Sequence, residues 1–154
     1  MKRNPHIIPL SRDHHTALLF GWKIRQGLAK GAALDRIRPY VLYFSGRHLE
    51  KHFAEEEELL FHNNTGCPLC DQAIEDHRQI RALVETIRDP EAGTPETYRT
   101  LADLLERHIR FEEREVFPWL ETQLAPERLA RVGAELRQLH QHPLADDYPD
   151  AFWN

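Results

Sequence analysis

Leu49-Glu50-Lys51-His52-x-x-x-Glu56-Glu57-x-x-x-Phe61 is a stretch that this chain repeats 56 residues later. The second copy reads Leu105-Glu106-Arg107-His108-x-x-x-Glu112-Glu113-x-x-x-Phe117. Each copy places a histidine four residues before a glutamate, and on a helix this spacing puts both side chains on one face, one turn apart. Two such pairs, each inside an apolar helical pattern, predict two facing helices that offer imidazole and carboxylate to a shared metal centre.

The composition is that of an ordinary globular protein. Of the 154 residues, 29% are charged and 41% are hydrophobic, and the net charge is -5 with the histidines neutral. This acidity argues against a nucleic-acid partner, whose footprint is basic, and no apolar run approaches the ~20 residues of a membrane span. The residues after Met1 include no apolar stretch of signal-peptide length, so we expect a cytoplasmic protein without a membrane partner.

Glycine and proline divide the chain into segments of helix length, and no stretch alternates with the period of a strand. We expect long helices at about residues 11–30, 39–62, 68–88 and 94–122, and a shorter one at about 126–140. Ser11 is expected to cap the first helix and Gly31 to end it. Pro118 should kink the last turn of the fourth helix, and the aromatic residues of the tail after Pro143 should pack back onto the helices.

Four helices of about 20 residues with short connections predict an all-α fold, an up-down-up-down four-helix bundle with a short additional C-terminal helix. The bundle covers about residues 8–122, the extra helix and tail cover about 126–154, and together they form one domain, 1–154. Asp13-His14 in the first segment is echoed by Asp76-His77 in the third. The chain therefore reads as two helical hairpins, each an Asp-His helix followed by a His-x-x-x-Glu helix.

Each of the four expected bundle helices carries a histidine on its core-facing stripe, and two also carry a glutamate there. Burying an ionised glutamate without a partner costs several kcal/mol at least, whereas a pair of divalent metals would neutralise both glutamates. Imidazole and carboxylate together suit non-haem iron, with manganese and zinc as competitors. The candidate metal ligands are His14, His52, Glu56, His77, His108 and Glu112.

A purely structural explanation competes with this one. A lone core-facing histidine is usually a hydrogen-bonded core residue, and a run such as Glu55-Glu56-Glu57-Glu58 is usually a solvated helix face. A duplicated structural hairpin would also produce the repeat. It would not, however, require polar residues in the seam of all four helices.

These motifs resemble those of the hemerythrin-like (HHE cation-binding) family, and the similarity covers about residues 8–122. The resemblance implies a four-helix bundle that holds a non-haem di-iron centre with an oxo or hydroxo bridge and two bridging carboxylates. It implies terminal ligation by the four histidines and bridging by Glu56 and Glu112. Oxygen-carrying members place the second bridging acid five residues after its histidine, which makes Glu113 the second choice for the second bridge. His15 is the alternative to its neighbour His14, but the spacing of the apolar stripe selects His14.

The chain departs from the oxygen carriers at Ala73, where they have a fifth histidine. His48 and Glu55 are the nearest replacements in the sequence, and His62, His140 and His142 are more distant ones. Fewer protein ligands would leave more open metal positions. This departure favours redox chemistry or sensing over reversible oxygen carriage.

Cys67-Pro68-Leu69-Cys70 lies where a loop enters the third helix. A thiolate at a helix N-terminus has a lowered pKa, and Cys-x-x-Cys is a redox spacing. The alternatives are two unremarkable thiols, a reversible disulfide, and a metal site completed by His62. No βαβ pattern surrounds the motif, which excludes a thioredoxin fold.

The sequence therefore predicts a di-iron protein that interacts with O2, NO or peroxide by binding, sensing or redox handling. One alternative is an iron- or oxygen-responsive regulator or an iron-centre repair protein that acts through a protein partner. Another is an enzyme such as a peroxidase, although no catalytic residue is identified, and the last is a metal-free structural bundle.

Overall fold

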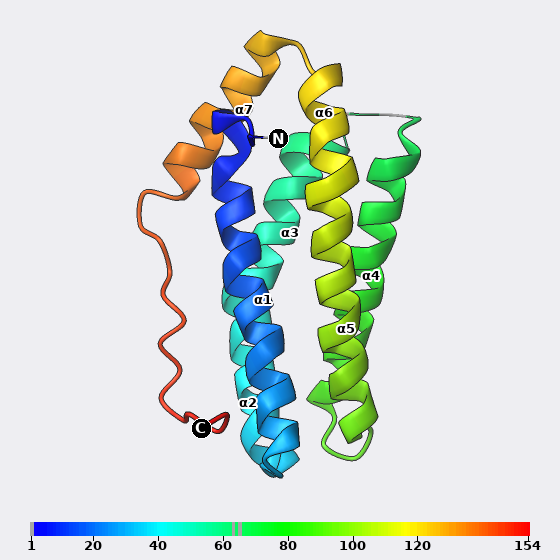
Figure 1. Cartoon of the computed structure of the whole chain (residues 1–154), viewed down its shortest axis with the longest axis vertical. Helices are drawn as coiled ribbons and strands as arrows, with labels where there is room; N and C mark the ends of the chain where they lie inside the picture. The colour runs from blue at the N-terminus through cyan, green and yellow to red at the C-terminus, as the bar shows by residue number, and fades with distance from the viewer. Residues whose placement is uncertain (1, 63, 65) are drawn as a thin grey trace.

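A computed structural model describes residues 2–62, 64 and 66–154, and these contain helices but no strand. The chain forms a bundle of four long helices, with α7 crossing one end (Figure 1). The α-helices are α1 (Ile8–Ala29), α2 (Leu34–Phe44), α3 (Glu50–Glu56), α4 (Pro68–Arg88), α5 (Pro95–Phe111), α6 (Phe117–Gln123) and α7 (Pro126–Leu139). The all-α bundle with an additional C-terminal helix is confirmed.

The second and fourth bundle helices are each built from several pieces. A 3-10 turn, η1 (Pro5–Ile7), leads into α1, and three π-helical turns join pieces of the long helices: η2 (Ser45–Leu49), η3 (Glu57–Phe61) and η4 (Glu112–Val116). The second helix is thus α2, η2, α3 and η3, and the fourth is α5, η4 and α6. The sequence pattern predicted uninterrupted helices here, because a π turn inserts a residue without a sequence signal of its own, and Gly46 in η2 does not by itself predict one.

Two predicted helix starts were wrong. The first bundle helix begins at Ile8, so Ser11 lies inside it, and the Ser11 hydroxyl donates a hydrogen bond to Glu113 instead of capping the helix. The second begins at Leu34, which leaves Pro39 inside α2, still within two turns of the start. In both cases the buried stripe extends further towards the N-terminus than the turn residues indicated.

Other boundaries agree with the sequence. Gly31 has a φ of +74°, which only glycine adopts freely, and it follows Lys30, the C-cap of α1. Thr94 caps α5 through a capping box with Thr97. Pro118 lies in the first turn of α6, just after the π turn η4, so the irregularity starts before this proline. The predicted stop of the second helix at Asn63-Asn64-Thr65-Gly66 falls partly outside the described residues.

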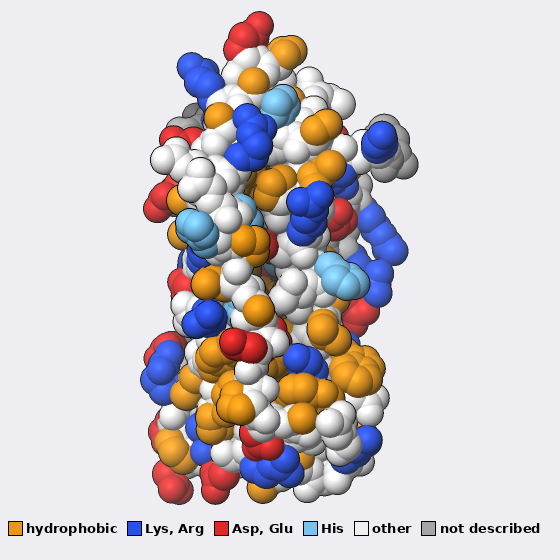
Figure 2. Space-filling view, turned by 90° about the vertical axis from the view of Figure 1, so that its left-hand side faces the viewer, with side chains coloured by type: hydrophobic (Ala, Val, Ile, Leu, Met, Phe, Trp, Pro, Cys, Tyr) orange, Lys and Arg blue, Asp and Glu red, His pale blue; other side chains and the backbone are white. Residues whose placement is uncertain are grey.

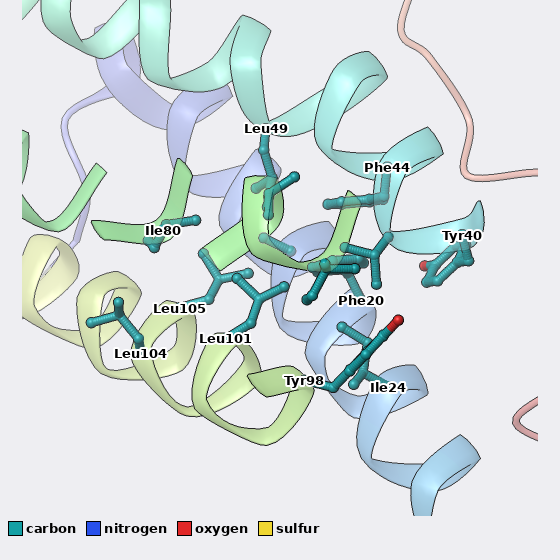
Figure 3. Packing of buried hydrophobic residues seen from close by; sticks show 14 of the residues in the cluster. Phe20, Ile24, Tyr40, Phe44, Leu49, Ile80, Tyr98, Leu101, Leu104 and Leu105 are labelled. Atoms are coloured by element: carbon teal, nitrogen blue, oxygen red, sulfur yellow. The ribbon is translucent and has the colours of Figure 1, made fainter. Parts of the chain in front are cut away.

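Two apolar clusters fill the bundle on either side of a polar layer. The larger cluster includes Phe20, Tyr40, Phe44, Tyr98 and Leu101 (Figure 3). The other cluster contains Leu10, Leu60, Phe117, Leu120 and Leu136. On α1 and α4 the histidine stands between a residue of one cluster and a residue of the other: Leu10, His14 and Ala17 on α1, and Ala73, His77 and Ile80 on α4.

The tail after α7 runs back along the bundle beside α1 and α2 (Figure 1). Phe152 is 2% exposed and fills the space above Gly27, where a Cβ atom would lie 2.6 Å from the ring. Asp146 accepts hydrogen bonds from Lys23 and Tyr40 at 3.1 and 2.5 Å. The expected packing of the aromatic tail onto the bundle is therefore confirmed. No helix among the described residues has both the length and the apolar character needed to cross a bilayer.

Candidate metal centre

The six candidate ligands come from all four bundle helices and meet in the polar layer. Glu56, Glu112 and His77 are fully buried, and the other three histidines are at most 6% exposed. The structure thus brings together every residue that the sequence singled out for this site. The six residues are His14 on α1, His52 and Glu56 on α3, His77 on α4, His108 on α5 and Glu112 at the start of η4.

Each glutamate oxygen Oε1 stands between two histidines. The Glu56 Oε1 atom lies 3.1 Å from Nε2 of His52 and 3.2 Å from Nε2 of His77. Likewise, the Glu112 Oε1 atom lies 3.1 Å from Nε2 of His108 and 2.9 Å from Nε2 of His14. The side chains therefore form two groups that could each hold a metal ion: His14, His52, Glu56 and Glu112, and Glu56, His77, His108 and Glu112.

The outer nitrogen of every one of these histidines contacts a further carboxylate. An ionised carboxylate can only accept a hydrogen bond, so each Nδ1 carries the proton and donates it. This arrangement fixes the ring orientation and leaves Nε2 facing the centre of the layer. The four Nδ1 contacts are His14 to Glu113 at 2.8 Å, His52 to Asp13 at 3.0 Å, His77 to Glu57 at 2.7 Å and His108 to Asp76 at 3.0 Å.

With the protons on Nδ1, neutral histidines would point lone pairs at one another. The Nε2 atoms of His77 and His108 are only 3.1 Å apart. Both carboxylate oxygens of Glu56 and Oε2 of Glu112 are buried and have no hydrogen-bond partner among the described residues. Converging lone pairs without donors are what a bound cation satisfies, so these residues fit a divalent metal pair.

Protons can occupy the same positions as metal ions. Burial opposes a positive charge on His52 and His108, but Glu56 and Asp13 raise the pKa of His52 to about 9, and Glu112 and Asp76 raise that of His108 to about 10. The pKa of His77 is also raised by nearby carboxylates in spite of its burial. Metal ions entering this layer must therefore displace protons.

The π turns lie directly beside the glutamates. In a π turn the residue five positions on comes round to the same face, so Phe61 follows Glu56 and Phe117 follows Glu112 on the inner side. The Phe117 ring stacks on His14 with a centroid distance of 5.4 Å, and the Phe61 ring lies 6.0 Å from that of His77. Each copy of the sequence repeat thus closes over the histidine of the opposite hairpin.

The structure separates the alternatives that the sequence left open. Glu113 faces His14 Nδ1 and not the centre, and His15 is exposed. Ala73 is a core residue of the apolar cluster around Phe117. His48 stacks on Phe44, and Glu55 pairs with His140, so neither belongs to the two groups described above.

Sequence reasoning missed the four outer carboxylates as a set. Asp13 and Asp76 were noticed only as part of the echo, and Glu57 only as part of the repeat. The signal was nevertheless present in both halves of the chain. An aspartate precedes the histidine of α1 and of α4, and a second glutamate follows Glu56 and Glu112. Position within the repeat therefore distinguishes inner from outer carboxylates.

The two cysteines are free thiols in this structure. Both thiols are buried, and the Cys67 sulfur accepts a hydrogen bond from the backbone N–H of Cys70 at 3.1 Å, which caps α4. Burial and the neighbouring Cys67 raise the pKa of the Cys70 thiol, against the lowered value expected at a helix start. His62 forms no metal-ligating group with them among the described residues.

Comparison with known families agrees with the geometry. The hemerythrin HHE cation-binding domain matches residues 6–120, which covers all four bundle helices, and the chain belongs to this family. A comparison with curated proteins and one with solved structures found no match. The family and the buried histidine and glutamate groups together indicate a domain that binds metal cations.

Proposed function

We propose that the chain holds a non-haem di-iron centre and through it binds, senses or chemically handles O2, NO or peroxide. The observation that carries this proposal is that the two ligand groups share both of their glutamates. A shared carboxylate bridges two cations, so the arrangement favours a metal pair over two separate ions. In this proposal the four histidines are terminal ligands, and Glu56 and Glu112 are the bridges.

The donor set supports iron among the possible metals. Imidazole and carboxylate suit iron, manganese and zinc, and neither group contains a thiolate. When bound, a pair of irons supplies redox steps and open positions for a small ligand. Ala73 contributes no donor where oxygen carriers of this family have a histidine, which supports redox handling or sensing over oxygen carriage.

The chain's own residues enclose most of the layer, and a pocket on the tail side reaches it at His52. Phe53 stacks on His77 with a centroid distance of 3.9 Å, and the two apolar clusters close the layer from above and below. Diatomic molecules and peroxide can diffuse through such packing during side-chain motions, whereas an organic substrate cannot enter without opening the bundle.

Metal analysis with an absorption spectrum of the freshly purified protein tests the proposal. About two irons per chain and near-ultraviolet charge-transfer bands are the expected result. One metal per chain, or zinc alone, would show that the shared glutamates do not hold an iron pair. No metal uptake from ferrous iron under anaerobic conditions would leave a structural bundle and overturn the proposal.

A regulatory role is the second candidate, and the position of the tail favours it. Pro143 and Leu144 of the tail line a pocket that also contains His52. A change at the metal centre can therefore reach a segment that a protein partner could contact. Metal-dependent protection of the tail from proteolysis supports this role, and identical cleavage with and without metal argues against it.

A cytoplasmic location and a single domain over 1–154 are further parts of the proposal.

A further inference from the structure

A pocket opens on the tail side of the bundle, against His52. It has a volume of about 360 Å³, within the ~300–1,000 Å³ range of small-molecule sites. Asp13 and His52 lie on its inner side, and α7 and the tail contribute Arg137 and Leu144. The pocket therefore lies outside the candidate metal centre but touches one of its histidines.

The charges around this pocket are unbalanced. Its two nearby carboxylates already have partners, because Asp13 accepts from His52 at 3.0 Å, and Glu55 contacts His140 at 2.8 Å and Lys51 at 3.2 Å. By contrast, Arg12 and Arg137 line the pocket without a hydrogen bond or ion pair to any described residue. Arg47 adds a further cation to the lining, whereas the Lys51 charge is matched by Glu55. The unmatched charge, that of Arg12, Arg47 and Arg137, is positive, which suits an anion.

The lining also has apolar walls. Phe44 and Leu49 belong to the larger apolar cluster and form one wall, and Pro143 and Leu144 of the tail form another. The space-filling view of this face shows Lys, Arg and His side chains over its upper part and hydrophobic side chains gathered over its lower part (Figure 2). An occupant that matches both the basic residues and the apolar walls of the pocket has a charged head and an apolar body.

The second half of the repeat has acids where the first has Arg12 and Arg47. Glu75 corresponds to Arg12, because each precedes an Asp-His pair, and Asp103 corresponds to Arg47 in the repeated frame. Both acids pair with arginines, Glu75 with Arg78 and Asp103 with Arg25. The basic pocket is therefore a property of the first hairpin and its tail, and the symmetric ligand layer does not require it.

We propose that this pocket binds a small organic anion, with a carboxylate held between Arg12 and Arg137 and an aliphatic or aromatic body against Phe44 and Leu144. Arginine binds carboxylates through charge-assisted, often bidentate hydrogen bonds, and the apolar wall separates such acids from inorganic anions. The metal ions of the proposed function are not needed for this site.

Calorimetric titration of hexanoate tests the site, with hexanamide as the uncharged probe and inorganic phosphate as the anion without an apolar body. Metal-loaded and chelator-treated protein are titrated side by side. We expect hexanoate to bind both forms, and hexanamide and phosphate to bind at least about tenfold more weakly. Equal binding of hexanoate and hexanamide, or of hexanoate and phosphate, would overturn the proposal.

Arg137→Gln and Arg12→Gln should each weaken hexanoate binding roughly tenfold. Arg131→Gln is the matched control, because Arg131 is exposed on the same helix as Arg137 but does not line this pocket. Binding that needs the metal and ignores both pocket substitutions would place the anion on the metal centre and refute this site. All three arginines are exposed, so circular dichroism should show unchanged folding.

Discussion

Glu112 and Glu113 are adjacent in the sequence, yet their carboxylates do different things. The Glu112 side chain is fully buried between His14 and His108, whereas that of Glu113 is 31% exposed and accepts from His14 Nδ1 and from Ser11. One residue along a helix turns a side chain by about 100°, and this rotation separates an inner from an outer carboxylate.

Replacing each of these neighbours by glutamine tests the assignment. Glu112→Gln should lower the iron content from about two to about one per chain or less, because it removes a bridge. Glu113→Gln should keep the metal stoichiometry and weaken affinity roughly 10–100-fold, because it only orients His14. Metal titration of both variants distinguishes the two roles. If Glu113→Gln lowered the iron content and Glu112→Gln kept it, Glu113 would be the bridging residue.

The pH dependence of the metal-free protein follows from its raised histidine pKa values. The pKa of His52 is about 9 and that of His108 about 10 in the folded state, against an ordinary 6.5. A folded pKa above the unfolded one means that the stabilisation is complete below about pH 6.5 and is lost as the pH rises through 9 to 10.

Urea unfolding of the metal-free protein at about pH 6.5 and pH 9.5 measures this loss. The free energy of unfolding should be lower at the higher pH. Metal-loaded protein is the control, because metal ions replace the protons and should remove this decrease. A metal-free protein that gains stability over this range would show that the histidines are neutral in the folded state.

At the scale of elements, helix caps and buried stripes explain most of what could be predicted. Pro68, Thr94 and Pro126 each mark the start of a helix within one residue. The π turns were not predictable in this way, because no cap residue marks their start: η2, η3 and η4 each follow a residue with ordinary helical φ and ψ. The ligand stripe was nonetheless found, because His52 and Glu56 both lie within α3, and Glu112 is only the first residue of η4 after His108 in α5.

The cap of α4 gives a prediction at this scale. Cys67→Ala removes the sulfur that accepts from the Cys70 backbone and should cost about 1 kcal/mol of stability. The serine side chain is nearly the same size as that of alanine but keeps an acceptor oxygen, so Cys67→Ser should cost clearly less stability. Urea denaturation of both variants measures the difference, and equal losses would show that the sulfur contributes by packing alone.

At the scale of the whole molecule, the tail closes the hydrophobic cluster from outside. Phe152 packs 5.4 Å from Tyr40 between ring centroids and occupies the space above Gly27. The sequence indicated that aromatic residues of the tail pack back, but it could not indicate where, because that depends on Gly27 leaving a gap in α1.

Phe152→Ala should destabilise the protein by about 3 kcal/mol, since it empties a buried site. Gly27→Ala should also destabilise it, because the new Cβ would lie 2.6 Å from the Phe152 ring and displace it. Gly46→Ala is the control, because nothing lies within 4 Å of its Cβ position, and it should be neutral or stabilising. Thermal unfolding compares the three, and equal effects of the two glycine variants would rule out close packing of the tail on Gly27.

The shared glutamates also bear on how such a chain could have arisen. Each group of candidate ligands takes two histidines and a glutamate from one hairpin and its second glutamate from the other. Two separate copies of a single hairpin, related by a twofold axis, would present the same six side chains and the same outer acids. A homodimeric ancestor could therefore have held the whole centre before its gene was duplicated and fused. Fusion would then have allowed the two halves to diverge, as they do where Arg12 and Arg47 line the pocket beside His52 and Glu75 and Asp103 stand at the corresponding positions.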